Sequence, residues 1–304
     1  MTAKWDVSAS SWSQLWHARV SYLLAGAGVD HVMIKGQTWS GPLFIPDARV
    51  GDVDVLVSPA AFATAVDALL AAGLTLEHGK LNRFGSAVHS VVLRARNGPE
   101  VDLHDRYPGL DAPPHVTWAA LRSHVVPAEL AGVHVPALDE PAQALIAAAS
   151  VARDGSSSAS ARRLAAAIED IDWSAVGALA NQTGGRPAVR AALESLGRPD
   201  HADLLGLPST PARWWLVQAN APSDTRRVQE LLDAKPSVRW RMLLRDVLPP
   251  RQMMRIIDPS TADRGRLYLA GAHLRRWSRI VRRLPGVARD LRTARRTQRG
   301  RSGS

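Results

Sequence analysis

Two aspartates separated by one residue are the part of this sequence best suited to chemistry. Asp52 and Asp54 lie in the run Arg49-Val-Gly-Asp-Val-Asp-Val-Leu-Val57. On a β-strand, residues with this spacing point to the same face, about 6–7 Å apart. Their like charges repel, and a divalent cation such as Mg²⁺ (or Mn²⁺) would relieve the repulsion, with carboxylate and substrate phosphate oxygens as its ligands. The pattern alone also fits an edge strand that carries two solvated acids.

A second acidic segment follows in Glu100-Val-Asp-Leu-His-Asp105. On a strand, Asp102 and His104 share one face, and the apolar residues between them face the other way. A third carboxylate beside an Asp-x-Asp strand is what a two-metal phosphoryl-transfer site needs. We therefore predict Asp52, Asp54 and Asp102 as catalytic residues and metal ligands, with Asp102 also positioning or deprotonating the attacking oxygen. A surface acid and a structural histidine are the alternatives for Asp102 and His104.

Two basic residues and a glycine upstream of the aspartates are suited to binding phosphate groups. Lys35 and Gly36 lie where a strand is expected to turn into a helix, and glycine there would let phosphates approach the backbone N–H groups. Lys35 would add a point charge for a triphosphate, and Arg49 could hold a phosphate or brace the acids. We predict Lys35, Gly36, Arg49 and His104 as substrate-binding residues. The alternative is an ordinary turn with solvated cations.

The elements that would position these residues alternate at short intervals in the first part of the chain. Asn97-Gly98 between two strand-like runs predicts a hairpin. The expected strands are 31–34, 52–57, 74–78, 88–96 and 99–105, and the expected helices are 11–25, a stretch from 36 to about 42–46, and 60–72.

Beyond residue 136 the sequence is rich in Ala and Leu at helical spacing, with breaks at 154–158 and 183–185. Helical patterns return over 211–248 and 264–297, and a frayed end is expected from 299. The predicted fold is an α/β nucleotidyltransferase-like N-terminal domain with a mixed sheet, followed by a mainly α-helical domain. The predicted boundaries are 11–135, 136–273 and a basic helix with its tail over 274–304.

The net charge of +10 comes from one end of the chain. Residues 274–304 contain eleven Arg and one acid, so the remainder is neutral. The segment could bind nucleic acid or an acidic membrane surface. We favour the alternative that it packs on the body through a stripe of apolar residues: Leu274, Trp277, Ile280, Val281 and Leu284.

The composition excludes several classes of protein. Without cysteine the chain has no disulfide scaffold, no thiolate zinc site and no cysteine nucleophile. No run reaches the roughly 18 apolar residues that a membrane-spanning helix needs, and residues 1–12 do not have the pattern of a secretory signal. We expect a cytoplasmic protein with no transmembrane segment.

The order of these motifs resembles that of the uncharacterised nucleotidyltransferase family related to the DNA polymerase β superfamily. The resemblance covers roughly residues 15–250. Its parts are Ile34-Lys-Gly36, the Asp-x-Asp run, Val101-Asp-Leu-His104, Val135-Pro-Ala-Leu138, Arg163-Leu164 and residues 168–173. The resemblance implies a nucleotidyltransferase core in which Asp52, Asp54 and Asp102 hold Mg²⁺ and an NTP is the substrate. Members of this family occur in bacterial gene clusters that include peptide natural-product pathways, such as lasso peptides.

Two functions follow as hypotheses. The first is an enzyme that moves an NMP group from an NTP to an unidentified acceptor, either a small molecule or a peptide. The second is a degenerate nucleotidyltransferase fold that binds nucleotide or peptide without turnover. Binding of nucleic acid through the Arg-rich segment is a third hypothesis, and the neutral body disfavours it as the main function.

Overall fold

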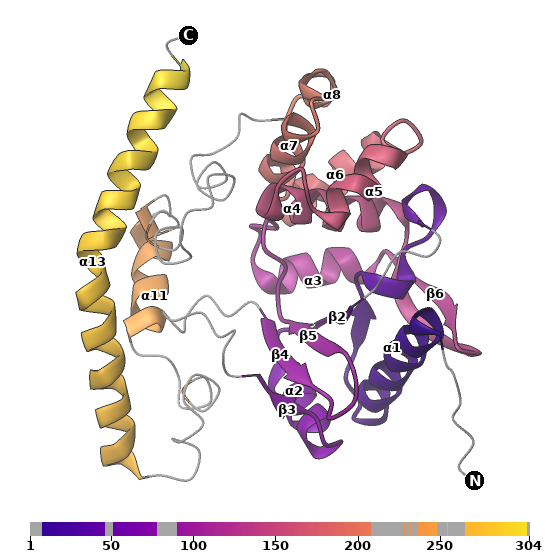
Figure 1. The fold of residues 1–304 in the computed structure, drawn as a ribbon, viewed down its shortest axis with the longest axis horizontal. Coiled ribbons are helices and arrows are strands. Elements are labelled where there is room, and N and C mark those ends of the chain that lie inside the picture. The colour runs from indigo at the N-terminus through magenta and orange to yellow at the C-terminus, as the bar shows by residue number, and fades with distance from the viewer. Residues whose placement is uncertain are drawn as a thin grey trace. The chain divides into compact units, whose positions relative to one another are not determined.

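The described residues of the computed structural model form two compact units. The structure describes residues 8–45, 51–77, 90–207, 228, 231–232, 236–247, 254 and 265–302. The first unit holds the described residues up to 77 and from 90 to 207, and the second holds those from 228 onward. The fold of each is drawn in Figure 1.

A mixed sheet of seven strands forms the centre of the first unit. Its order is β3-β4-β5-β2-β1-β7-β6, so β2 is the middle strand. The pairs β2–β5 and β1–β7 are parallel, and the other neighbours are antiparallel. The strands are β1 (His31–Met33), β2 (Asp52–Val57), β3 (Thr75–Leu76), β4 (Ser90–Arg94), β5 (Glu100–His104), β6 (Val125–Leu130) and β7 (Val133–Leu138).

The middle strand is the best anchored part of the sheet. Val53, Val55 and Val57 are completely buried on one face, as the alternating pattern predicts. On the other face Leu56 and Asp54 are buried as well, because neighbouring elements cover both sides of β2. The core therefore surrounds the strand that carries the Asp-x-Asp pair.

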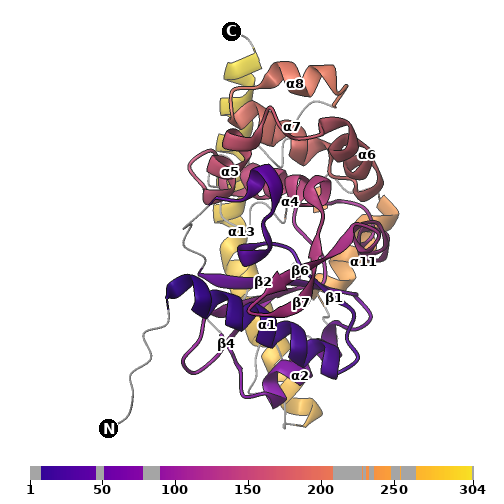
Figure 2. The same cartoon turned by 90° about the vertical axis from the view of Figure 1, so that its right-hand side faces the viewer.

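Helices accompany the sheet and then form a bundle of their own. Figure 2 shows α4 to α8 gathered at one end of the unit, with α1 and α2 beside the sheet. The helices are α1 (Ala9–Gly26), α2 (Phe62–Ala71), α3 (Pro114–Arg122), α4 (Glu140–Asp154), α5 (Ala159–Ala167), α6 (Trp173–Thr183), α7 (Arg186–Ser195) and α8 (Pro199–Leu204). The central helix α4 begins where the Asp139 side chain accepts a hydrogen bond from the Ala142 N–H.

The predicted fold class is confirmed by this sheet and the helices that follow it. The hairpin around Asn97-Gly98 is also confirmed, as β4 and β5 pair antiparallel. Part of its first predicted arm, residues 88–89, lies outside the described residues. The predicted domain boundaries stay predictions.

The helix predicted after Lys35 is wrong. Two 3₁₀ turns replace it, η1 (Gly36–Thr38) and η2 (Gly41–Leu43). Gly36 has φ +80° and Gly41 has φ +53°, and Pro42 follows the second glycine. Left-handed glycines and a proline interrupt the chain before a full α-helical turn can form.

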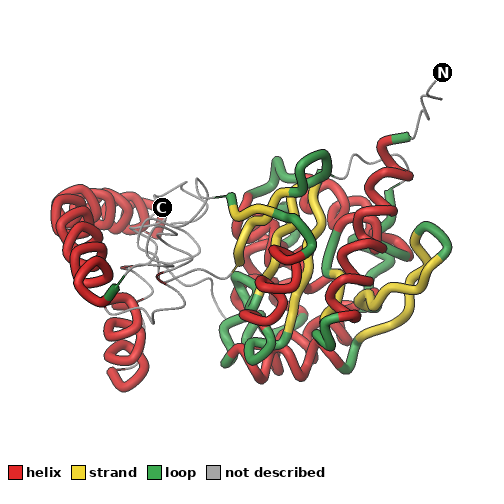
Figure 3. Tube along the Cα trace, turned by 90° about the horizontal axis from the view of Figure 1, so that it is seen from below, coloured by secondary structure: helices red, strands yellow, loops and turns green. Residues whose placement is uncertain are grey.

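The second unit contains two described helices, α11 (Pro236–Val247) and α13 (Arg266–Ser302). Figure 3 shows them as red tubes. The helix α13 continues to Ser302, past residue 299 where the frayed end is expected to begin, and the last two residues lie outside the described ones. Within the described residues, no helix is both long enough and apolar enough to cross a membrane.

The apolar stripe predicted to pack α13 on the body is largely exposed. Leu274, Trp277, Val281 and Leu284 are all exposed, and only Ile280 is half-buried. Among the described side chains of α13, the buried ones are Ala272, Arg276, Val287 and Leu291. Within the second unit α13 is therefore buried through a different side, and packing of the stripe on the first unit stays a prediction.

Candidate metal centre

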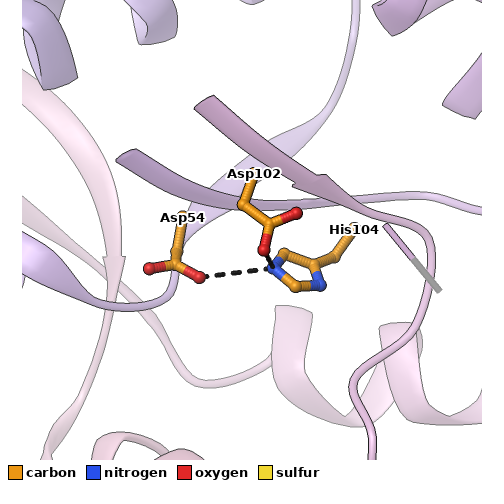
Figure 4. A group of neighbouring side chains, drawn as sticks. All are labelled: Asp54, Asp102 and His104. Atoms are coloured by element: carbon orange, nitrogen blue, oxygen red, sulfur yellow. Dashed lines mark hydrogen bonds and ion pairs between the residues drawn. The ribbon is translucent and has the colours of Figure 1, made fainter. Parts of the chain in front are cut away.

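The two acidic segments are neighbouring strands, and their register brings the acids together. Strands β2 and β5 run parallel, with Asp54 opposite Asp102 and Leu56 opposite His104. Directly paired residues project to the same face of a sheet. Asp54, Asp102 and His104 therefore converge on one side of the two strands, as Figure 4 shows.

A single nitrogen lies between the two carboxylates. His104 Nε2 is 3.3 Å from Asp54 Oδ1 and 3.4 Å from Asp102 Oδ2. The ligand atoms of the three residues lie within 4.8 Å of one another. The side chains of His104 and Asp54 are 1% and 8% exposed, whereas that of Asp102 is 28% exposed. The centre is thus buried at Asp54 and accessible at Asp102.

His104 carries a proton in this arrangement. Burial disfavours the charged imidazole, but Asp102 and Asp54 outweigh burial and raise the pKa of His104 to about 9. At neutral pH the Nε2–H is shared between the two carboxylates. The imidazolium therefore supplies positive charge where two carboxylates would otherwise repel each other.

Lys35 is the second cation at Asp54. Its Nζ lies 3.6 Å from Asp54 Oδ1 and 5.1 Å from the centre of the Tyr107 ring. Burial opposes its charge, while Tyr107 and Asp54 favour it, so the pKa of Lys35 is raised. Burial alone would raise the pKa of Asp54, but Lys35 and then His104 lower it. Asp54 is therefore an ionised carboxylate at neutral pH although it is buried.

An arginine that the sequence analysis did not single out lies on the same aromatic ring. The Arg153 guanidinium is 5.7 Å from the Tyr107 ring centre, and it forms two hydrogen bonds with Asp154. Burial opposes the charge of Arg153, but Tyr107 and Asp154 raise its pKa. Arg153 is the last basic residue of α4, and no local motif distinguishes it from the other arginines.

Tyr107 is fixed by the helix that carries Arg153. Its hydroxyl lies 2.7 Å from Ser150 Oγ. Because the Ser150 hydroxyl donates to the Ile146 carbonyl, the Tyr107 hydroxyl must be the donor to Ser150. Lys35 and Arg153 thus lie against the same buried ring.

The turn that follows Lys35 is held from both sides of the unit. His17 on α1 accepts a long hydrogen bond from the Gln37 N–H at 3.4 Å. From α4, the Gln143 amide donates to the carbonyls of Thr38 and Leu138 at 2.8 and 2.7 Å. The backbone of Ser40 donates to Gln143 Oε1 at 2.9 Å. The helical part therefore determines where the turn lies.

The remaining predicted residues have different outcomes. Asp52 shares the face of Asp54 but is exposed and lies outside the group of three. Surrounding protein and the charge of Asp54 raise its pKa. Gly36 begins a three-residue turn, so it does not form the helix N-terminus expected for phosphate. Arg49 lies outside the described residues. The roles assigned to all these residues remain predictions.

The group of three fits a divalent cation. Two carboxylate oxygens and one imidazole nitrogen within 4.8 Å can converge on one ion. Carboxylate oxygens suit Mg²⁺ and Mn²⁺, and imidazole binds a metal once it has lost its proton. The identity of the ion is not determined by this geometry.

The sequence matches one protein-family model. The family is described as an uncharacterised nucleotidyltransferase family, and the match extends over residues 12–198. It includes every residue of the group of three as well as Lys35 and Arg153, and it ends within the first unit. Comparison with curated proteins finds no match to the chain.

Proposed function

The chain belongs to the uncharacterised nucleotidyltransferase family, and from this premise we propose that it transfers a nucleoside monophosphate from an NTP to an acceptor. The observation that carries the proposal is the pairing of Asp54 with Asp102 across β2 and β5, with Lys35 on the same side. Two carboxylates and a cation at one point suit a metal-assisted transfer of a phosphate group.

The reaction joins an acceptor oxygen to the α-phosphorus of the NTP. The bond from that phosphorus to its bridging oxygen breaks, pyrophosphate leaves and the acceptor gives up a proton. A divalent cation held by Asp54 and Asp102 would stabilise the charge on the phosphates and make the acceptor hydroxyl more acidic.

The burial and charge of each acidic residue indicate its role in this reaction. Asp54 stays ionised because Lys35 and His104 lower its pKa, so it is a permanent anionic ligand. Asp102 is the more accessible carboxylate and takes the proton of the acceptor. His104 orients both carboxylates, and Asp52 serves as a further ligand at the open end of the strand.

Lys35 and Arg153 are the phosphate-binding residues of the proposal. Both are cations beside the Tyr107 ring, and both have raised pKa values that keep them charged. A triphosphate that reaches the carboxylates would lie against these two charges, where low exposure strengthens the attraction. Arg49 and Gly36, predicted from the sequence, would extend this phosphate site.

The first test combines binding with turnover. Calorimetry with Mn²⁺ and an α,β-methylene NTP should show a metal-dependent complex, which Asp54→Asn and Asp102→Asn weaken by roughly tenfold or more. The exposed Asp67 on α2 gives the matched control Asp67→Asn, which should bind as the wild type does. Wild-type affinity in Asp54→Asn would overturn the proposal.

Turnover separates the enzyme from a binding module. Pyrophosphate release is measured with each natural NTP, Mg²⁺ and pools of hydroxyl-bearing small molecules and peptides. Release that depends on the pool and is absent in Asp54→Asn supports the transferase. Metal-dependent binding without release in any pool supports the degenerate fold. A peptide acceptor would agree with the natural-product context that the sequence resemblance implies, and this context stays a prediction.

A further inference from the structure

Helix α13 exposes a continuous apolar stripe. Leu267, Leu274 and Val281 recur every seven residues and are 91%, 64% and 63% exposed. Trp277 and Leu284 each follow three residues after a member of this series and are also exposed. Residues with these spacings lie on one side of a helix, apart from the side on which Ala272 and Val287 are buried.

A second exposed stripe adjoins the first. On α11 four apolar residues follow the helical spacing and are exposed: Trp240, Leu243, Leu244 and Val247. The indole N–H of Trp277 donates to the Val247 carbonyl at 2.8 Å, so the end of α11 meets the middle of the α13 stripe. We call the two stripes together the joined apolar surface. Single exposed apolar residues are ordinary, whereas a contiguous group marks an interaction site.

Arginines border this surface on α13. Exposed arginines at positions 275, 279, 282 and 289 fall on the side of the helix next to the stripe. Asp290 is the one acid among the residues from 274 to the end, against eleven Arg. An apolar stripe beside a row of cations is typical of helices that lie in the plane of a membrane interface.

We propose that α13 and α11 bind the surface of a membrane that contains anionic lipids. The joined apolar surface enters the boundary between headgroups and acyl chains, and the arginines contact lipid phosphates. The row of arginines beside an apolar stripe favours an anionic membrane over a second copy of the chain or a nucleic acid. A second copy of the chain would bring two rows of arginines together, and a nucleic acid would leave the leucines and valine in water.

The test uses the full-length protein and lipid vesicles. We expect co-sedimentation with vesicles of phosphatidylcholine and phosphatidylglycerol, and little with phosphatidylcholine alone. The double variant Leu274→Asp/Val281→Asp should lower the partition coefficient by roughly tenfold or more, because two apolar side chains that would enter the acyl region become charged. Leu204 of α8, 85% exposed in the first unit, gives the matched control Leu204→Asp, which should bind as the wild type does.

The absence of cysteine allows a second readout that does not depend on affinity. A spin label on Val281→Cys should become protected from a water-soluble relaxation agent when anionic vesicles are added. A label on Leu204→Cys should stay accessible. Circular dichroism of each variant checks that the helices are retained.

Three outcomes would overturn the proposal. The first is equal vesicle binding by the wild type and Leu274→Asp/Val281→Asp. The second is a dimer in analytical ultracentrifugation that the same double variant abolishes, which would assign the surface to a second copy. The third is tighter binding to RNA than to anionic vesicles, with a steep salt dependence that the apolar substitutions leave unchanged.

Discussion

Asp54 is a buried carboxylate whose charge depends on two neighbouring cations. Lys35 and His104 both lie within 4 Å of the same oxygen, Oδ1. Removing one member of a buried ion pair leaves the other charge without compensation, which costs more than an exposed pair contributes. The protein must therefore retain a positive charge here before any metal or nucleotide arrives.

Substitution of Lys35 tests this balance. Lys35→Met should lower the free energy of unfolding by about 2–4 kcal/mol in the presence of a chelator, because the Asp54 charge loses one of its two cationic partners. Lys35→Arg should recover most of the loss. Urea unfolding measures both, with Arg122→Met as the control, since Arg122 pairs with Asp30 in an exposed position. A loss in Lys35→Met no larger than in the control would show that Asp54 does not rely on Lys35.

The pH dependence of stability follows from His104. Its pKa in the folded protein is about 9, above the ordinary value of 6.5, so its contribution is complete below about pH 6.5 and is lost as the pH rises through 9. In chelator, the wild type should exceed His104→Gln in unfolding free energy by more at pH 6 than at pH 9. Burial lowers the pKa values of His17 and His31, so these residues change the pH dependence of stability in the opposite direction. Both variants retain them, so their effect cancels in the difference between wild type and His104→Gln. A constant difference across this range would contradict the assignment.

At the scale of elements, α4 determines the position of the turn that carries Lys35. Gln143→Leu removes the amide donors to the carbonyls of Thr38 and Leu138, and it should cost about 1–3 kcal/mol of unfolding free energy. It should also weaken nucleotide binding, because Lys35 directly precedes this turn. The exposed Gln182 on α6 provides the control Gln182→Leu, measured in the same two assays. If Gln143→Leu is destabilised but binds nucleotide with unchanged affinity, the position of this turn does not affect nucleotide binding.

The hairpin that carries Asp102 packs tightly against α1. A Cβ atom at Gly98 would collide with the Trp16 ring and with Ala95. Gly98→Ala should therefore destabilise the protein by about 1–3 kcal/mol, through overpacking. Gly26→Ala, where a Cβ meets nothing, should be neutral in thermal unfolding. Equal melting temperatures for the two variants would contradict this packing.

The sequence predicts those elements whose signals are local. Strand β2 alternates valine with aspartate, and the β4–β5 hairpin has Asn-Gly at its turn, so both could be identified. The register of Asp54 with Asp102 joins residues far apart in the chain, and only tertiary pairing determines it. Strands β6 and β7 were not identified. Pro127 and Pro136 lie in them opposite each other, and proline argues against a strand in sequence patterns.

The same distinction holds for the site. Asp54, Asp102, His104 and Lys35 belong to motifs whose spacing has a structural meaning. Arg153 and Tyr107 belong to no such motif, because they are brought together by tertiary contacts between α4 and the segment that follows β5. The helix expected after Lys35 does not form for a local reason, the left-handed conformation of Gly36 and Gly41.

At the scale of the molecule, the proposed chemistry resides in the first unit. The family match ends at residue 198, and all described site residues precede it. A fragment of residues 1–207 should fold cooperatively and bind the Mn²⁺–nucleotide complex within about threefold of the full chain, since the charges that determine affinity are retained. Circular dichroism and calorimetry measure this. A folded fragment without nucleotide binding would place part of the site beyond residue 207.

In the proposed function, Asp54 and Asp102 jointly hold a metal ion that also binds the phosphates of an NTP. A crystal structure of the full chain with Mn²⁺ and an α,β-methylene NTP tests it most directly, because manganese can be located by its anomalous scattering. We expect a manganese peak in contact with oxygens of both aspartates, with the triphosphate beside Lys35. A nucleotide bound elsewhere, or manganese that contacts neither carboxylate while the nucleotide is present, would contradict it.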